Sequence, residues 1–126
     1  MKVTWKDEPE EHDFPAAAAY LSLLLPADAV NAAVDSLRAA QCTTRKAKDV
    51  LRASGLTLLP KDNPHVVADL AKVKEDKALS PILLIQGDAL TGRPLLIADG
   101  YHRVCASYWL DENTDIPCRL GALAAP

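Results

Sequence analysis

The chain has few of the features that mark secreted, zinc-binding or membrane proteins. Its three cysteines, Cys42, Cys105 and Cys118, are odd in number and irregularly spaced, which argues against a disulfide framework and a cysteine-rich zinc site. The longest apolar stretch, residues 14–25, is interrupted by Ser22 and is shorter than the roughly 20 residues that span a bilayer. The acidic beginning of the chain differs from the basic start of a signal peptide. These absences favour a soluble, cytoplasmic protein without a membrane partner.

A surplus of positive charge is also absent. The sequence has 14 Lys and Arg residues against 17 Asp and Glu residues, so the chain as a whole does not attract nucleic acid. A local basic stretch, Arg45, Lys46, Lys48 and Arg52, lies on a helix expected over residues 45–54. This stretch is typical of a solvated helix face. Nucleic-acid binding through residues 45–52 is the alternative, although no aromatic residues are interleaved there for base stacking.

The first part of the chain, residues 1–55, is expected to be a helical extension packed on a second part, residues 56–126. Apolar residues at helical spacing predict helices over residues 14–25 and 27–40. Residues 42–44 are interpreted as a linker with a threonine cap before the basic helix. The sequence shows no internal repeat.

The second part is expected to combine short strands with two helices. Strands are expected at residues 56–59, 82–85, 95–98 and 116–120, and helices at residues 64–76 and 101–110. Pro117 in the last strand indicates a sheet edge or a strand start, and the strand–helix–strand order over residues 95–120 predicts a β-α-β unit. The expected fold class is α/β or α+β, with a small mixed β-sheet, helices around it and a helical region before it.

The sharpest functional signal is the turn Asp99-Gly100-Tyr101-His102-Arg103, which joins an expected strand to an expected helix. The first N–H groups of a helix have no intrahelical partner and lie at the positive end of its dipole, so they attract anions. His102 and Arg103 add donors in that first turn. Asp99 is expected to cap the helix, with orientation of His102 or metal binding as alternatives. The five residues are predicted to bind a phosphate or another anion.

From residue 56 to residue 120 the order of elements resembles the ParB/sulfiredoxin-like domain. The likeness lies in an Asn-Pro turn that opens a helix, the segment Leu-Ser-Pro-Ile-Leu-Leu-Ile, the Asp-Gly-Tyr-His-Arg turn and the closing Ile-Pro-Cys-Arg-Leu. The resemblance implies a small sheet of that type and a phosphate site at the Asp-Gly-Tyr-His-Arg turn.

The turn differs from both branches of this family. Sulfiredoxins have Gly-Cys-His-Arg, and ParB-type domains have Gly-Glu-Arg-Arg followed by an alanine. In this chain Gly100, His102 and Arg103 match the sulfiredoxin pattern, which implies phosphate contacts from these residues. Tyr101 replaces the reactive cysteine, so the sulfiredoxin reaction is not expected. Ala106 matches the ParB pattern, but the DNA-binding helix-turn-helix that follows in ParB proteins is not implied.

A second group of polar residues, Lys61, Asp62, Asn63 and His65, surrounds the expected start of a helix. The simpler interpretation is an Asn63 cap with a surface histidine beside it. The resemblance implies a functional alternative, in which this helix start faces the Asp99–Arg103 turn across a cleft. Lys61 would then contact phosphate, and Asp62 would be a base or a metal ligand.

The sequence therefore predicts a protein that binds a nucleotide or another phosphorylated ligand. Phosphoryl transfer or hydrolysis would extend this binding, with Asp62 and His102 as catalytic residues and Mg²⁺ accompanying the nucleotide. In that version Asp62 or Asp99 holds the metal. The sequence has no P-loop, nucleophile elbow or paired-histidine metal motif. The alternatives are a non-catalytic interaction module, including a homodimer, and the nucleic-acid surface at residues 45–52.

Overall fold

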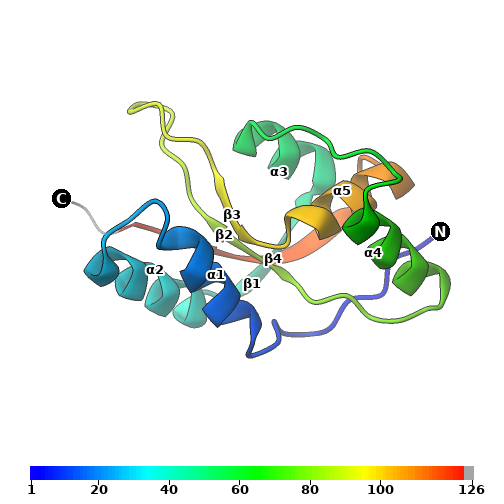
Figure 1. The fold of residues 1–126 in the computed structure, drawn as a ribbon, viewed down its shortest axis with the longest axis horizontal. Helices are drawn as coiled ribbons and strands as arrows, with labels where there is room; N and C mark the ends of the chain where they lie inside the picture. Colours follow the sequence, from blue (N-terminus) through cyan, green and yellow to red (C-terminus); the bar gives the residue numbers. More distant parts are fainter. Residues whose placement is uncertain (124–126) are drawn as a thin grey trace.

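The computed structural model describes residues 1–123 of the chain as a mixed sheet surrounded by helices (Figure 1). The expected fold class is confirmed. The helices are α1 (Asp13–Leu21), α2 (Ala27–Ala39), α3 (Ala47–Ser54), α4 (Pro64–Lys74) and α5 (Tyr101–Leu110). The strands are β1 (Cys42–Lys46), β2 (Ile82–Ile85), β3 (Leu96–Asp99) and β4 (Asp115–Gly121). None of the described helices is long and apolar enough to cross a membrane.

The strands lie in the order β1-β4-β2-β3. β4 is antiparallel to β1 and parallel to β2, whereas β3 is antiparallel to β2. The strands on either side of α5, β3 and β4, therefore run in opposite directions with β2 between them. The prediction of a β-α-β unit over residues 95–120 is wrong, because such a unit joins two parallel strands.

Both faces of the sheet are covered, which explains the four consecutive buried residues of β2. Leu83 and Ile85 pack with the apolar faces of α1 and α2. Ile82 and Leu84 alternate with them and pack with α3 and α5 on the opposite face. Figure 1 shows this arrangement, with α1 and α2 on one side of the strands and α3 and α5 on the other.

Helix α4 packs on α5 rather than on the sheet. Asn63 Oδ1 accepts hydrogen bonds from the N–H groups of His65 at 3.0 Å and Val66 at 3.2 Å, so the predicted cap is confirmed. Val66 is buried against Cys105 and Ala106 of α5. This contact brings the N-terminal half of α4 beside the start of α5.

Two predictions between residues 42 and 59 are wrong, and the start of a predicted helix is shifted by two residues. Residues 42–44, expected as a linker, belong to β1 because their backbone pairs with β4. The helix expected over residues 45–54 begins at Ala47, since the two preceding residues continue that strand. Residues 56–59, expected as a strand, form none; Leu58 and Leu59 pack on the α4–α5 core without a neighbouring strand. The first part of the chain is therefore not wholly helical.

Two further elements differ from their predicted limits or place. α1 ends at Leu21, earlier than the helix expected over residues 14–25. Pro117 indicated a sheet edge or a strand start; β4 is an interior strand, and Pro117 is its third residue. Pro117 faces Thr44 of β1 and precedes Cys118, the first residue of β4 that pairs with β2. The missing N–H of the proline therefore removes no bond from the β2–β4 ladder.

The N-terminal segment lies along the loop that precedes β2. Trp5 and Leu79 form a parallel bridge, in which Lys6 N donates to Leu79 O at 2.8 Å and Leu79 N donates to Thr4 O at 2.9 Å. Val3 is buried beside this contact. This bridge places residues 10–13 beside the region where β3 ends and α5 begins.

Candidate functional site

The turn between β3 and α5 requires glycine for two reasons. Gly100 has a φ of +110°, and a Cβ at this position would lie 2.4 Å from Cγ2 of Ile82. Gly100 is also the N-cap of α5, and no side chain caps the helix start. The predicted capping role of Asp99 is therefore wrong. The N–H groups of the first turn remain directed away from the helix, as an anion site requires.

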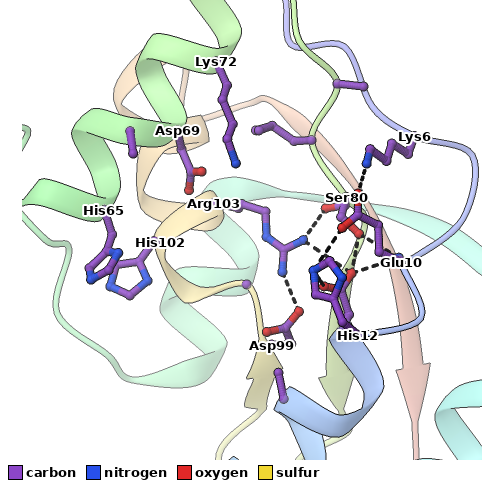
Figure 2. A pocket seen from close by; sticks show the side chains of 16 residues that line it. Lys6, Glu10, His12, His65, Asp69, Lys72, Ser80, Asp99, His102 and Arg103 are labelled. Carbon is purple, nitrogen blue, oxygen red and sulfur yellow. Dashed lines mark hydrogen bonds and ion pairs between the residues drawn. The ribbon is translucent and has the colours of Figure 1, made fainter.

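A cleft with a volume of about 530 Å³ opens beside this turn (Figure 2). Its first wall is α4, which contributes His65, Asp69 and Lys72. Its second wall is the start of α5, with Gly100, His102 and Arg103. The third wall is the N-terminal segment together with the loop before β2, and includes Lys6, Glu10, His12, Asp13 and Ser80.

Arg103 connects the second and third walls. Its Nη2 lies 2.6 Å from Asp99 Oδ2, and its Nη1 donates to Ser80 O at 2.7 Å and lies 3.9 Å from Asp13 Oδ2. The Arg103 side chain is only 13% exposed. Its charge is therefore already shared between two carboxylates, and the residue holds the walls of the cleft in place.

Burial affects the ionisation of two groups at the start of α5. Burial raises the pKa of Asp99 above its ordinary value, and the ion pair with Arg103 opposes this change. Burial lowers the pKa of His102, with positive charge from His65 and Arg103 in the same direction and Asp69 in opposition. His102 is accordingly a neutral imidazole at pH 7, able to donate or accept a hydrogen bond.

Three α4 residues face the α5 turn. The imidazole rings of His65 and His102 lie 4.5 Å apart between centroids. Burial raises the pKa of Asp69 above its ordinary value, and nearby Lys72 is the largest opposing influence. Figure 2 shows Asp69 and Lys72 extending from α4 toward the cleft beside Arg103. This wall combines a cation, a carboxyl group and a histidine within one helix face.

The structure brings five of the residues predicted from the sequence into the cleft. These residues are His65, Asp99, Gly100, His102 and Arg103. They come from three elements, so the predicted juxtaposition of the α4 start with the α5 turn holds for His65 and His102.

The other four predicted site residues lie outside the cleft lining. Lys61 lies over the Trp109 ring, with its Nζ 5.1 Å from the ring centroid. Asn63 caps α4, and the Tyr101 hydroxyl donates to the Thr57 carbonyl. Asp62 is exposed on the turn before α4 and does not line the cleft.

Several residues of the site were missed by sequence reasoning. Asp69 and Lys72 follow His65 at the i+4 and i+7 positions of α4, and this helical spacing was a usable signal. Glu10 and His12 reach the cleft only because the N-terminal segment bridges to the loop before β2. No local pattern indicates that contact.

The basic stretch does not form one helix face. Arg45 and Lys46 lie on β1, whereas Lys48 and Arg52 lie on α3. Lys46 Nζ pairs with Asp115 at 3.3 Å, and Arg52 pairs with a carboxylate of its own helix. This distribution weakens the structural basis for a nucleic-acid surface at residues 45–52.

Comparison of the chain with models of protein families, with curated proteins and with solved structures gave no match in any of the three. The function of the cleft is therefore inferred from its own residues and their geometry. An uncapped helix start, two histidines and a lysine are suited to an anionic group.

Proposed function

We propose that the cleft binds a small phosphorylated ligand, such as a nucleotide, with a phosphate at the start of α5. The observation that carries this proposal is the uncapped start of α5, which opens into the same cleft as His65, Lys72 and His102. A phosphate there accepts hydrogen bonds from backbone N–H groups in the first turn, while the side chains neutralise its charge.

The roles of the two walls differ. Lys72 of α4 is exposed and free to reach an anion. Arg103 of α5 is already engaged by Asp99 and the Ser80 carbonyl, so it supports the phosphate site by holding its walls. Lys72 and His102 are the side chains that provide direct contacts.

The size of the cleft and the family resemblance support the same ligand class. A volume of about 530 Å³ lies within the range of roughly 300–1,000 Å³ that small-molecule sites occupy. The Gly-Tyr-His-Arg sequence at residues 100–103 resembles the phosphate-binding turn of the ParB/sulfiredoxin-like family. The proposal is limited to binding, because Asp62, the predicted catalytic carboxylate, does not line the cleft.

The test is a titration of the purified protein with ATP, ADP, AMP and inorganic phosphate, followed by calorimetry and thermal unfolding. Lys72→Ala is expected to weaken the tightest of these interactions by about tenfold, equivalent to one charge-assisted contact of about 1.4 kcal/mol. Lys74→Ala is the matched control, because Lys74 is exposed on the same helix and lies outside the cleft lining.

The proposal fails if none of the four compounds binds. It also fails if Lys72→Ala and Lys74→Ala weaken binding equally, since the affinity would then reflect general surface charge. Arg103→Ala is unsuitable for this purpose, because it leaves Asp99 without its partner and disturbs the fold as well as the site.

A further inference from the structure

Three side chains on the third wall of the cleft converge on one point. His12 Nε2 lies 3.0 Å from Glu10 Oε2 and 3.4 Å from Asp13 Oδ1. One ligand atom from each of the three residues lies within 4.8 Å of both others. The group joins an imidazole nitrogen to two carboxylate oxygens, so it is chemically different from a cluster of acidic residues.

The spacing matches that of donors around a small divalent ion. Zinc–nitrogen and zinc–oxygen bonds of about 2.0–2.2 Å place neighbouring donors about 2.8–3.6 Å apart, with the shorter values in octahedral and the longer values in tetrahedral geometry. The two distances from His12 Nε2, 3.0 and 3.4 Å, lie in this range. His12 therefore lies at ligand spacing from both carboxylates, and an ion that binds all three residues would draw the two carboxylate oxygens, which lie within 4.8 Å of each other, to the same spacing.

The outer oxygens of the two carboxylates are held by other groups. Asp13 Oδ2 accepts hydrogen bonds from the Ser80 hydroxyl and, at 3.0 Å, from Glu10 N. Glu10 Oε1 is paired with Lys6. Such contacts orient ligands in metal sites and leave the inner oxygens directed at the ion.

Asp13 supplies a buried carboxylate oxygen to the group. Its side chain is only 7% exposed, and its Oδ1 lies 3.4 Å from the imidazole of His12. The His12 side chain is 76% exposed. A desolvated carboxylate oxygen at the cleft edge thus lies beside an exposed imidazole.

The charge around the group also favours a cation. Three carboxylates, Glu10, Asp13 and Asp99, are accompanied by two fully charged cations, Lys6 and Arg103. When His12 acts as a neutral ligand, this surrounding charge is negative. A divalent ion offsets this negative charge. Lys6 and Arg103 need not move, because they lie beside the outer oxygens of Glu10 and Asp13.

We propose that Glu10, His12 and Asp13 bind a divalent transition-metal ion of the zinc type. An imidazole donor favours Zn²⁺, Co²⁺ or Ni²⁺ over Mg²⁺ and Ca²⁺, which prefer oxygen ligands alone. Three protein ligands leave further coordination positions for water or for a cleft ligand, as in metal sites that remain open. This site does not depend on the proposed phosphate binding.

The test uses the chelator-treated full chain and the metals alone. Zn²⁺ binding is measured by calorimetry, and Co²⁺ binding by its visible absorption, which reports the donor set. His12→Ala and Glu10→Gln are each expected to weaken Zn²⁺ binding by at least about tenfold, with a changed Co²⁺ spectrum. Because His12 is exposed, its substitution is expected to leave the fold intact, and circular dichroism verifies this.

His65→Ala and His102→Ala are the matched controls, because these two histidines line the first and second walls of the same cleft, whereas His12 lies on the third. The proposal predicts unchanged Zn²⁺ affinity in both. Absence of Zn²⁺ and Co²⁺ binding to the native chain overturns it. Binding that survives His12→Ala, or that is lost in the His65 and His102 variants instead, also overturns it.

Discussion

His102 is the residue whose chemistry depends most on its neighbours. Its sequence position indicates an anion contact, but its ionisation is determined by what packs around it. Burial lowers the pKa of His102 below the ordinary value of 6.5. His65 from α4 and Arg103 from its own helix act in the same direction, whereas Asp69 from α4 opposes them. The free protein therefore presents a neutral imidazole to the cleft at pH 7.

A bound dianion reverses this preference, which predicts a pH dependence. The anion stabilises the imidazolium form and raises the pKa of His102, so binding takes up a proton. Affinity is then expected to rise as pH falls from about 7.5 to about 6, by up to about tenfold for each pKa unit gained. Sulfate is the suitable probe, since it remains a dianion across this range.

The measurement is sulfate calorimetry in buffers with different ionisation enthalpies, which counts the protons taken up. His102→Asn is expected to flatten the pH profile and reduce proton uptake. Equal profiles in the native and variant proteins would show that His102 is not the group that titrates.

The junction of β3 and α5 shows how two elements place a site. The helix start is available to an anion because the chain turns sharply at Gly100 and packs its backbone against Ile82. Arg103 then connects the turn to the third wall of the cleft, through its contacts with the Ser80 carbonyl and Asp13. The turn is therefore a packing feature as well as the proposed binding feature.

Gly100→Ala is expected to destabilise the protein by about 2–4 kcal/mol. The loss combines a positive φ, which costs a side chain roughly 1–2 kcal/mol, with a steric clash against the buried Ile82 side chain. Gly55→Ala is the matched control, since Gly55 has a φ of +69° and no atom within 4 Å of an added Cβ.

Urea denaturation of the two variants separates these contributions. The control is expected to show the conformational cost alone, about 1–2 kcal/mol. Equal losses in both variants would contradict the steric argument and leave only the backbone cost at Gly100.

For the whole molecule, the sheet divides the buried side chains into two cores. β2 contributes to both, because alternate residues of this strand face α1 and α2 or α3 and α5. β2 also pairs on both sides, with β3 and β4. It is consequently the element least able to open without unfolding of the entire domain.

Amide hydrogen exchange tests this view of the fold. The hydrogen-bonded amides of Ile82–Ile85 are expected to exchange only through global unfolding, with protection equal to the full free energy of unfolding. Residues 56–59, which form no strand, are expected to exchange through local opening and to be at least about a hundredfold less protected. Similar protection in the two segments would contradict the central role of β2.

Local patterns in the sequence were sufficient for part of this structure. The apolar run 82–85 and the helix over residues 101–110 were predicted with the limits that the structure shows. The Asn63 cap was equally clear. Each depends on residues within a few positions of one another, where spacing and side-chain chemistry decide the backbone conformation.

The tertiary structure decided what distant segments do together. β1 is a strand because β4 pairs with it, although its own residues resemble a linker. Arg103 holds the cleft because Ser80 and Asp13, far away in the sequence, meet its guanidinium. The sequence by itself determined where the turn between β3 and α5 lies. Packing decided which side chains surround that turn, because those contacts arise only when the chain closes on itself.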